Sequence, residues 1–262
     1  MKRKIFMFVT LLAVAVLSLG TLTACDEPPA PPVSVEGVEF ETAVINLDRD
    51  GTHTLIYTVF PEDADNKAIS FSSANSQIVL VSESGVLTAK VAGSAKITIT
   101  TEDGNKTAEC TVNVAPPAGY SLYSNSYISL VYPSTYLKQE SGEDAQFQAG
   151  LVQTTPNFTV ITEDKNNIME TTTMEEYKTM LEQMYAVLKI TATVSLPVRS
   201  TVTFNDISCT KITMATTISG VTINQEQYII QTSTKTVNIT FTLSASDSRN
   251  FIDVVLGELL LV

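Results

Sequence analysis

Cysteine and histidine are the residue types best suited to nucleophilic or metal chemistry, and this chain has three cysteines and one histidine. Cys25 has the most distinctive setting, because the residues before it follow the order of a secretory signal. Three basic residues (2–4) come first, an uncharged and largely apolar run covers residues 5–24, and small residues end the run. The pattern predicts export of the chain and a cut next to Cys25.

The four residues Leu22, Thr23, Ala24 and Cys25 resemble the bacterial lipobox. The resemblance implies that residues 1–24 are a signal peptide and that Cys25, with a diacylglycerol on its sulfur, begins the mature protein. The alternative is an uncleaved membrane helix, since about 20 apolar residues span a bilayer. The basic end stays inside in both cases. We therefore expect a protein held on the extracytoplasmic face of the cell membrane, with acyl chains (palmitate) as its anchor and no other cofactor.

The charge balance limits the partners of the chain. The formal net charge is −12, and the mature form is more acidic because residues 1–24 carry three cations and no anion. Affinity for nucleic acid comes from Lys and Arg contacts to phosphate, so a nucleic-acid partner is not expected. The acidity favours solubility and repulsion from a membrane surface.

Two proline-rich breaks divide the mature chain. Residues 25–33 form a tether rich in proline, which favours an extended polyproline II conformation. The run Ala115-Pro116-Pro117-Ala118-Gly119 is the second break. We expect one domain over 34–115, a linker at 116–119 and a second domain over 120–262.

The first domain is predicted to be an all-β sandwich, because short β-branched and aromatic runs alternate with turn signals at a spacing of 8 to 12 residues. The expected strands lie in residues 55–60, 69–73, 78–82, 85–91, 96–101 and 107–114. The domain resembles the group 2 bacterial Ig-like domains of intimin- and invasin-like surface proteins. The matching segments are 55–61, 64–75, 81–89, 93–98 and 107–112, with Phe71 where the family often has Trp. The resemblance implies a rigid spacer or cell-adhesion module and no catalytic residue.

The second domain is predicted to be α+β, with an antiparallel sheet covered by two helices. Thr173 to Glu176 form a capping-box sequence, and apolar residues follow at helical spacing to Leu188. The second helix begins near Asp247 and presents apolar residues up to Leu259. Strands are expected at 127–132, 147–152, 158–162 and through 194–243, with hairpin turns at Gly220 and at residues 233–234. Residues 128–133, 174–177, 227–228 and 251–256 resemble the PsbP-like α/β/α sandwich, which implies a protein-binding or accessory role.

The search for chemistry predicts no catalytic and no metal-binding residue. His53 is expected to face solvent on a strand, and Cys110 and Cys209 to be free and buried. The acidic run at 62–66 could bind Ca²⁺, but a polar turn is the favoured interpretation. The runs at 140–144, 163–164 and 175–176 could supply a glycosidase acid pair, but solvated surface is favoured. Met174, Met180 and Met184 could line an adaptable groove, although packing against the sheet is favoured.

The leading hypothesis is a non-enzymatic, lipid-anchored scaffold in which the Ig-like domain is a spacer. The second domain then binds a protein or a cell-wall polymer. Two alternatives remain open: a carrier or sensor of a small apolar ligand, and an extracytoplasmic hydrolase.

Overall fold

The computed structural model describes residues 31–149, 156–165, 168–244 and 249–262. The first nine strands make up what we call the N-terminal domain. Their bounds are β1 Gly37–Phe40, β2 Val44–Leu47, β3 Thr52–Thr54, β4 Tyr57–Phe60, β5 Ile69–Ser73, β6 Val79–Val81, β7 Val86–Ala89, β8 Gly93–Thr101 and β9 Thr107–Val114. The strands form sheets of order β1-β4, β2-β9-β8-β5 and β3-β7-β6. The predicted all-β domain is confirmed.

Strict alternation in β8 and β9 creates the core of this domain. Ile97, Ile99, Cys110 and Val112 are all buried on one side, whereas the threonines between them lie on the other side. Such a strand buries one face of the sheet and exposes the other. Strands β1 and β2 lie before the first strand expected from the sequence, and all three residues of β3, which contains His53, are exposed.

Phe71 occupies an aromatic position in this core. Its ring packs edge-on against Tyr57, with 5.6 Å between ring centroids, and stacks on Phe40 at 6.5 Å. Gly85 lies beneath the ring with a φ of +78°, and a Cβ there would come within 3.0 Å of Phe71. Phe71 therefore fills the aromatic site, and only glycine fits the turn beneath it.

The C-terminal domain contains the remaining strands and the three described helices. The strands are β10 Tyr120–Ser124, β11 Ile128–Pro133, β12 Leu137–Ser141, β13 Asp144–Gln148, β14 Asn157–Asp164, β15 Ala192–Val194, β16 Val198–Phe204, β17 Ile207–Ile218, β18 Val221–Gln231, β19 Lys235–Ser244 and β20 Leu260–Leu261. The helices are α2 Ile168–Thr171, α3 Met174–Val187 and α4 Asn250–Gly257. Eight strands form one antiparallel sheet in the order β12-β13-β14-β19-β18-β17-β15, with β16 also paired to β17. Strands β10, β11 and β20 form a smaller antiparallel sheet.

Helix α4 packs on one face of the large sheet over a stack of aromatic rings. Phe147 and Phe158 stack with 4.3 Å between ring centroids, and Phe158 stacks on Phe241 at 5.1 Å. Ile252, Val255 and Leu256 of α4 are fully buried in the same cluster. The predicted start near Asp247 lies outside the described residues. Leu259 was expected on the helix, but it follows the helix and is still buried.

Helix α3 lies on the other face and covers it only in part. Thr173 and Glu176 form the predicted capping box, with the Glu176 amide donating to Thr173 Oγ1 at 3.2 Å. None of the helix residues is fully buried. The prediction that the methionines pack against the sheet is wrong for Met180 and Met184, which are 52% and 46% exposed. Of the three methionines named from the sequence, Met174 packs on the small cluster of Ile212, Met214 and Ile229. Tyr177 and Leu181 of the same helix pack there too, along one narrow stripe.

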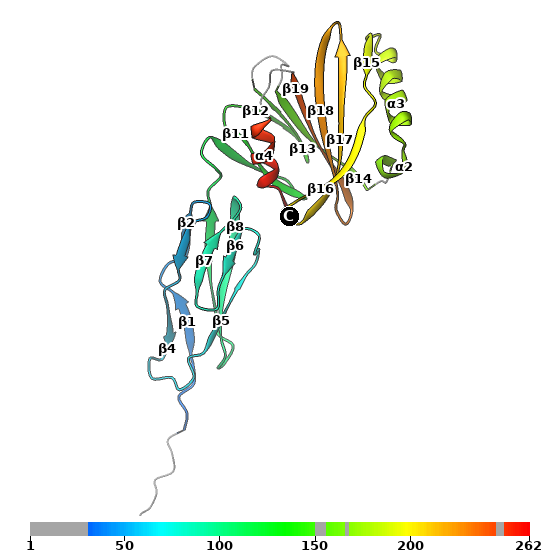
Figure 1. The fold of residues 1–262 in the computed structure, drawn as a ribbon. Helices are drawn as coiled ribbons and strands as arrows, with labels where there is room; N and C mark the ends of the chain where they lie inside the picture. The colour runs from blue at the N-terminus through cyan, green and yellow to red at the C-terminus, as the bar shows by residue number, and fades with distance from the viewer. Residues whose placement is uncertain (1–30, 150–155, 166–167, 245–248) are drawn as a thin grey trace, which may run out of the picture.

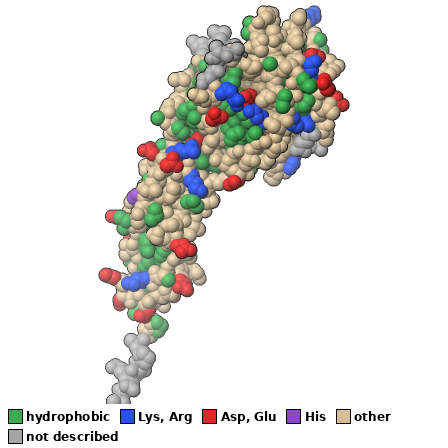
Figure 2. Space-filling view, in the orientation of Figure 1, with side chains coloured by type: hydrophobic (Ala, Val, Ile, Leu, Met, Phe, Trp, Pro, Cys, Tyr) green, Lys and Arg blue, Asp and Glu red, His purple; other side chains and the backbone are tan. Residues whose placement is uncertain are grey.

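The two domains lie end to end, so the molecule is elongated (Figure 1). The linker after β9 leads into β10, and the end of β20 returns to the same junction, close to the top of the N-terminal domain (Figure 1). Figure 2 shows acidic side chains along the N-terminal domain and a mixed group of basic and acidic side chains on the C-terminal domain. The described residues contain no helix long and apolar enough to cross a membrane.

Candidate functional site

The predicted lipid site, Cys25 with Leu22, Thr23 and Ala24, lies outside the described residues. The other two thiols are buried and free, as predicted. Burial raises the pKa of Cys110, and it raises the pKa of Cys209 to about 11. Thiols with raised pKa values are poor nucleophiles at neutral pH. His53 is exposed on β3, as predicted.

Acidic residues singled out in the sequence form hydrogen bonds and ion pairs within the protein. Asp65 accepts a hydrogen bond from the Val33 amide at 2.7 Å, and Asp164 pairs with Lys235 at 2.7 Å. Hydrogen bonding to Lys235 lowers the pKa of Asp164, and hydrogen bonds from Thr173 lower that of Glu176. A general acid needs the opposite shift. Among the residues that the structure describes, no three or more His, Cys, Asp or Glu side chains are grouped to hold a metal ion.

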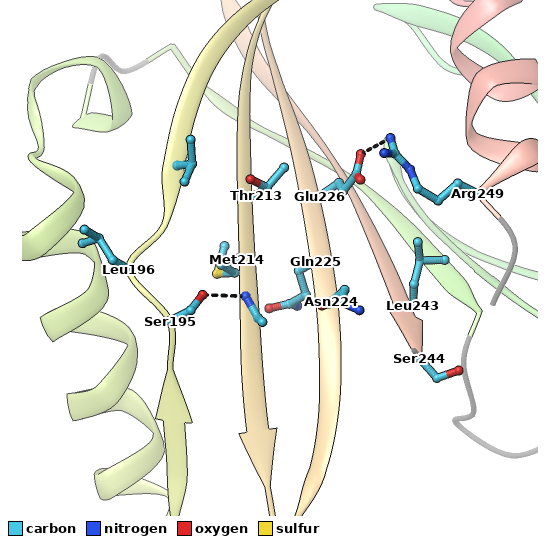
Figure 3. Close-up of a pocket in the computed structure, with 12 residues that line it drawn as sticks. Ser195, Leu196, Thr213, Met214, Asn224, Gln225, Glu226, Leu243, Ser244 and Arg249 are labelled. Atoms are coloured by element: carbon cyan, nitrogen blue, oxygen red, sulfur yellow. Dashed lines mark hydrogen bonds and ion pairs between the residues drawn. The ribbon is translucent and has the colours of Figure 1, made fainter. Parts of the chain in front are cut away.

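The most distinctive polar feature is a hollow of about 470 Å³ on the α4 face of the large sheet, beyond the start of the helix (Figure 3). We call it the charged hollow. Strands β17, β18 and β19 form its floor, the segment between β15 and β16 forms one side, and Arg249 stands where the chain enters α4 (Figure 3). The lining residues that matter for its chemistry are Ser195, Thr213, Asn224, Glu226, Leu243 and Arg249.

Glu226 is the centre of an ionic cluster at one end of the charged hollow. Its Oε2 atom accepts from Lys211 Nζ at 2.9 Å, from Arg249 Nη2 at 2.9 Å and from the Tyr228 hydroxyl at 2.7 Å. Only 10% of the Glu226 side chain is exposed. Burial raises the pKa of Tyr228, and the hydrogen bond to Glu226 raises it further. A buried carboxylate needs such partners.

The sheet register brings these residues together. Thr213 on β17 faces Glu226 on β18, and Lys211 faces Tyr228. The register follows from the tight turn at Ser219 and Gly220, which both have positive φ values. The turn was predicted from the sequence, but the residue pairs that follow from it were not, so the ionic cluster was missed.

A second polar site joins the two domains. The Glu258 side chain, at the end of α4, is completely buried, and its Oε1 is paired with Nη1 of Arg49 from the N-terminal domain. Its Oε2 accepts a hydrogen bond from the Ala92 amide at 2.7 Å. Both oxygens of this carboxylate are therefore satisfied by the N-terminal domain.

Two further contacts extend this junction. Leu260 is 1% exposed and belongs to the same buried cluster as Ile78 and Val79 of the N-terminal domain. At the turn between β16 and β17, the Asn205 side chain donates to the carbonyl oxygens of Gly257 and Leu259, at 3.0 and 2.9 Å. The Asn205 carbonyl accepts from Gln77 Nε2 at 3.1 Å. Apolar, ionic and hydrogen-bond contacts thus fasten the domains together.

Comparison with known proteins identifies the N-terminal domain. Residues 34–112 match the family model of the bacterial Ig-like domain (group 2), as the sequence predicted. The chain is 35% identical over 82 residues to kappa-carrageenase of Pseudoalteromonas carrageenovora, which is 31% of this chain and 21% of that protein. It is 36% identical over 89 residues to lacto-N-biosidase of Bifidobacterium bifidum, which is 34% of this chain and 8% of that protein. The chain therefore spans about a fifth or less of these relatives.

Two solved structures are similar to parts of the chain. The solution structure of cyanobacterial PsbP from Synechocystis sp. PCC 6803 aligns over 55% of this chain and 94% of that chain, at 10% sequence identity and a TM-score of 0.44. The crystal structure of an intimin mutant from EHEC O157:H7 aligns over 33% of this chain and 42% of that chain, at 23% identity and a TM-score of 0.23.

Proposed function

We propose that this protein is a lipid-anchored, non-enzymatic binding protein of the cell envelope. The Ig-like domain serves as a rigid spacer, and the C-terminal domain binds a protein or a cell-wall polymer. The junction around Glu258 is the observation that carries the proposal. A spacer that must hold a binding domain at a fixed angle needs a stiff joint, and a satisfied buried ion pair with an apolar anchor provides one.

The C-terminal domain is best interpreted as a PsbP-like α/β/α sandwich. The antiparallel sheet between α4 and α3 supports this interpretation, even though α3 covers its face incompletely. The aromatic stack of Phe147, Phe158 and Phe241 fills the space under α4. That packing disfavours an enclosed apolar ligand and supports the proposal of a binding surface on the outside of the domain.

The anchor is tested by growing cells with labelled palmitate and following the label on the protein. Cys25→Ser is expected to abolish labelling and to release the protein from the membrane fraction. Cys110→Ser is the matched control, because its thiol is buried in the Ig-like core, and it should keep the label. Label on Cys25→Ser would disprove the anchor.

The binding role is tested by co-sedimentation of the full chain, in neutral detergent, with purified cell-wall sacculi and with envelope proteins. Saturable binding to either fraction is the expected result. If the partner contacts both domains, Arg49→Ala should weaken this binding, because the variant loosens the junction between the two domains. No saturable binding to either fraction would contradict the proposed function.

A further inference from the structure

A role as spacer and scaffold does not account for the charged hollow. At one end of this hollow, Lys211 and Arg249 share the single carboxylate of Glu226. Asp253, in the first turn of α4, is a second carboxylate close enough to act on Tyr228 of this cluster. Acidic residues outnumber basic residues in the chain as a whole, so two cations on one carboxylate beside a hollow are a distinctive arrangement.

Arg249 has the geometry of a ligand-binding group. A guanidinium has five N–H donors, and the hydrogen bond to Glu226 uses Nη2. Its side chain is 53% exposed, and Figure 3 shows it at the rim of the hollow, reaching toward Glu226. Glu226 thus fixes the guanidinium in place while other donors remain available to an anion. Guanidinium is well suited to carboxylate recognition.

Further polar side chains line the charged hollow beyond Arg249. Asn224 and Thr213 line the hollow, and their side chains make no hydrogen bond to another described residue. Ser195 accepts from the Ala215 amide at 2.8 Å, so its own hydroxyl hydrogen can be donated. These groups offer both donors and acceptors, which is what alcohol groups of a ligand require.

Two apolar side chains complete the lining. Leu243 is buried in the floor on β19, and the exposed side chain of Val198 lines the opposite side of the hollow on β16. The volume of about 470 Å³ lies within the range of small-molecule sites. A ligand that fits would combine an anionic group, several hydroxyl groups and a compact C–H surface.

We propose that the charged hollow binds a small hydroxylated organic acid of the sugar-acid class. The ligand carboxylate pairs with Arg249, its hydroxyl groups bond to Asn224 and Thr213, and its C–H face rests on Leu243. The inference rests on the proposed function, because it assigns a ligand class to the domain that is proposed to bind.

The test is isothermal titration calorimetry of the full chain in neutral detergent, with D-glucuronate as the probe and D-glucose as its uncharged counterpart. Arg249→Gln removes the cation, and Asn224→Ala removes an exposed amide that makes no contact needed for folding. Lys178→Gln is the control, since it removes a cation from α3 on the opposite face of the sheet. Thermal melting checks that each variant is folded.

Saturable glucuronate binding is expected, with glucose at least about tenfold weaker. Arg249→Gln should weaken glucuronate binding at least about tenfold, Asn224→Ala should weaken both sugars, and Lys178→Gln should change neither. The absence of glucuronate binding, equal binding of the two sugars, or unchanged binding by Arg249→Gln would overturn the inference. Sedimentation with sacculi or envelope proteins, measured on the same samples, shows separately whether the proposed function holds.

Discussion

Replacing Arg49 with alanine would remove the cation from the domain junction and leave Glu258 buried. The Glu258 carboxylate would keep one described partner, the Ala92 amide at 2.7 Å. Replacing Glu258 with glutamine is a milder change, because the amide oxygen can still accept from Ala92. It also leaves Arg49, whose side chain is 43% exposed, free to be hydrated. Replacing Arg49 should therefore destabilise the protein more than replacing Glu258.

The magnitudes follow from the burial of each partner. Removing one member of a buried pair costs about 3–5 kcal/mol when the other charge stays buried. Water can enter the space left by the half-exposed Arg49 side chain, so we expect Arg49→Ala to cost about 3 kcal/mol, at the low end of that range. Glu258→Gln should cost about 1 kcal/mol, the value of a weakened hydrogen bond. The double variant should resemble Glu258→Gln alone.

Urea denaturation followed by far-UV circular dichroism measures these changes. Hydrogen exchange, resolved by peptide, shows whether the loss is at the junction: the Ala92 amide and the backbone of β20 should exchange faster in Arg49→Ala. Lys96→Ala is the matched control, because the ion pair of Lys96 with Glu109 is exposed on the Ig-like domain. Surface pairs contribute about 0–1 kcal/mol.

The double-mutant cycle decides the outcome. A junction held by a buried ion pair requires strongly non-additive effects, with Arg49→Ala the more costly single change. Additive effects, or an Arg49→Ala variant no less stable than Lys96→Ala, would refute the argument that the Glu258 carboxylate joins the domains.

Three further outcomes are expected. Leu260→Ala should lower the free energy of unfolding by about 2–5 kcal/mol and split thermal unfolding into two calorimetric transitions, whereas Leu261→Ala, at a 38% exposed position, should do neither. Thr173→Ala should cost α3 about 1 kcal/mol, measured as faster amide exchange in its first turn. Burial raises the pKa of Cys209 to about 11. The stability that the buried thiol contributes should therefore be intact below pH 9 and lost as the pH rises through 11. Denaturation series of wild type and Cys209→Ala over this pH range measure the loss.

Patterns of local origin were predictable from the sequence. The alternation of Ile97, Ile99, Cys110 and Val112 predicted the Ig-like core, and the capping box predicted the start of α3. Both signals arise within a few neighbouring residues. The exposure of Met180 was not predictable, because helical spacing shows which residues share a stripe but not how wide a stripe the sheet covers.

The two polar sites differ in how far the sequence could reveal them. The pairing of Lys211 with Tyr228, and so the position of Glu226 beside them, follows from the turn at Gly220 once the strands are counted from it. The contact of Arg49 with Glu258 has no such signal, because the two residues lie in different domains. Only the packing of one domain on the other brings them together.

The return of β20 to the Ig-like domain has a consequence for the timing of folding. An Ig-like domain that precedes a second domain would ordinarily finish folding while the rest of the chain is still being synthesised. Here Leu260, which fills part of the Ig-like core, is among the last described residues to emerge. The Ig-like core is therefore incomplete until the second domain has folded, and the intermediate has an unfilled apolar site that a chaperone can recognise.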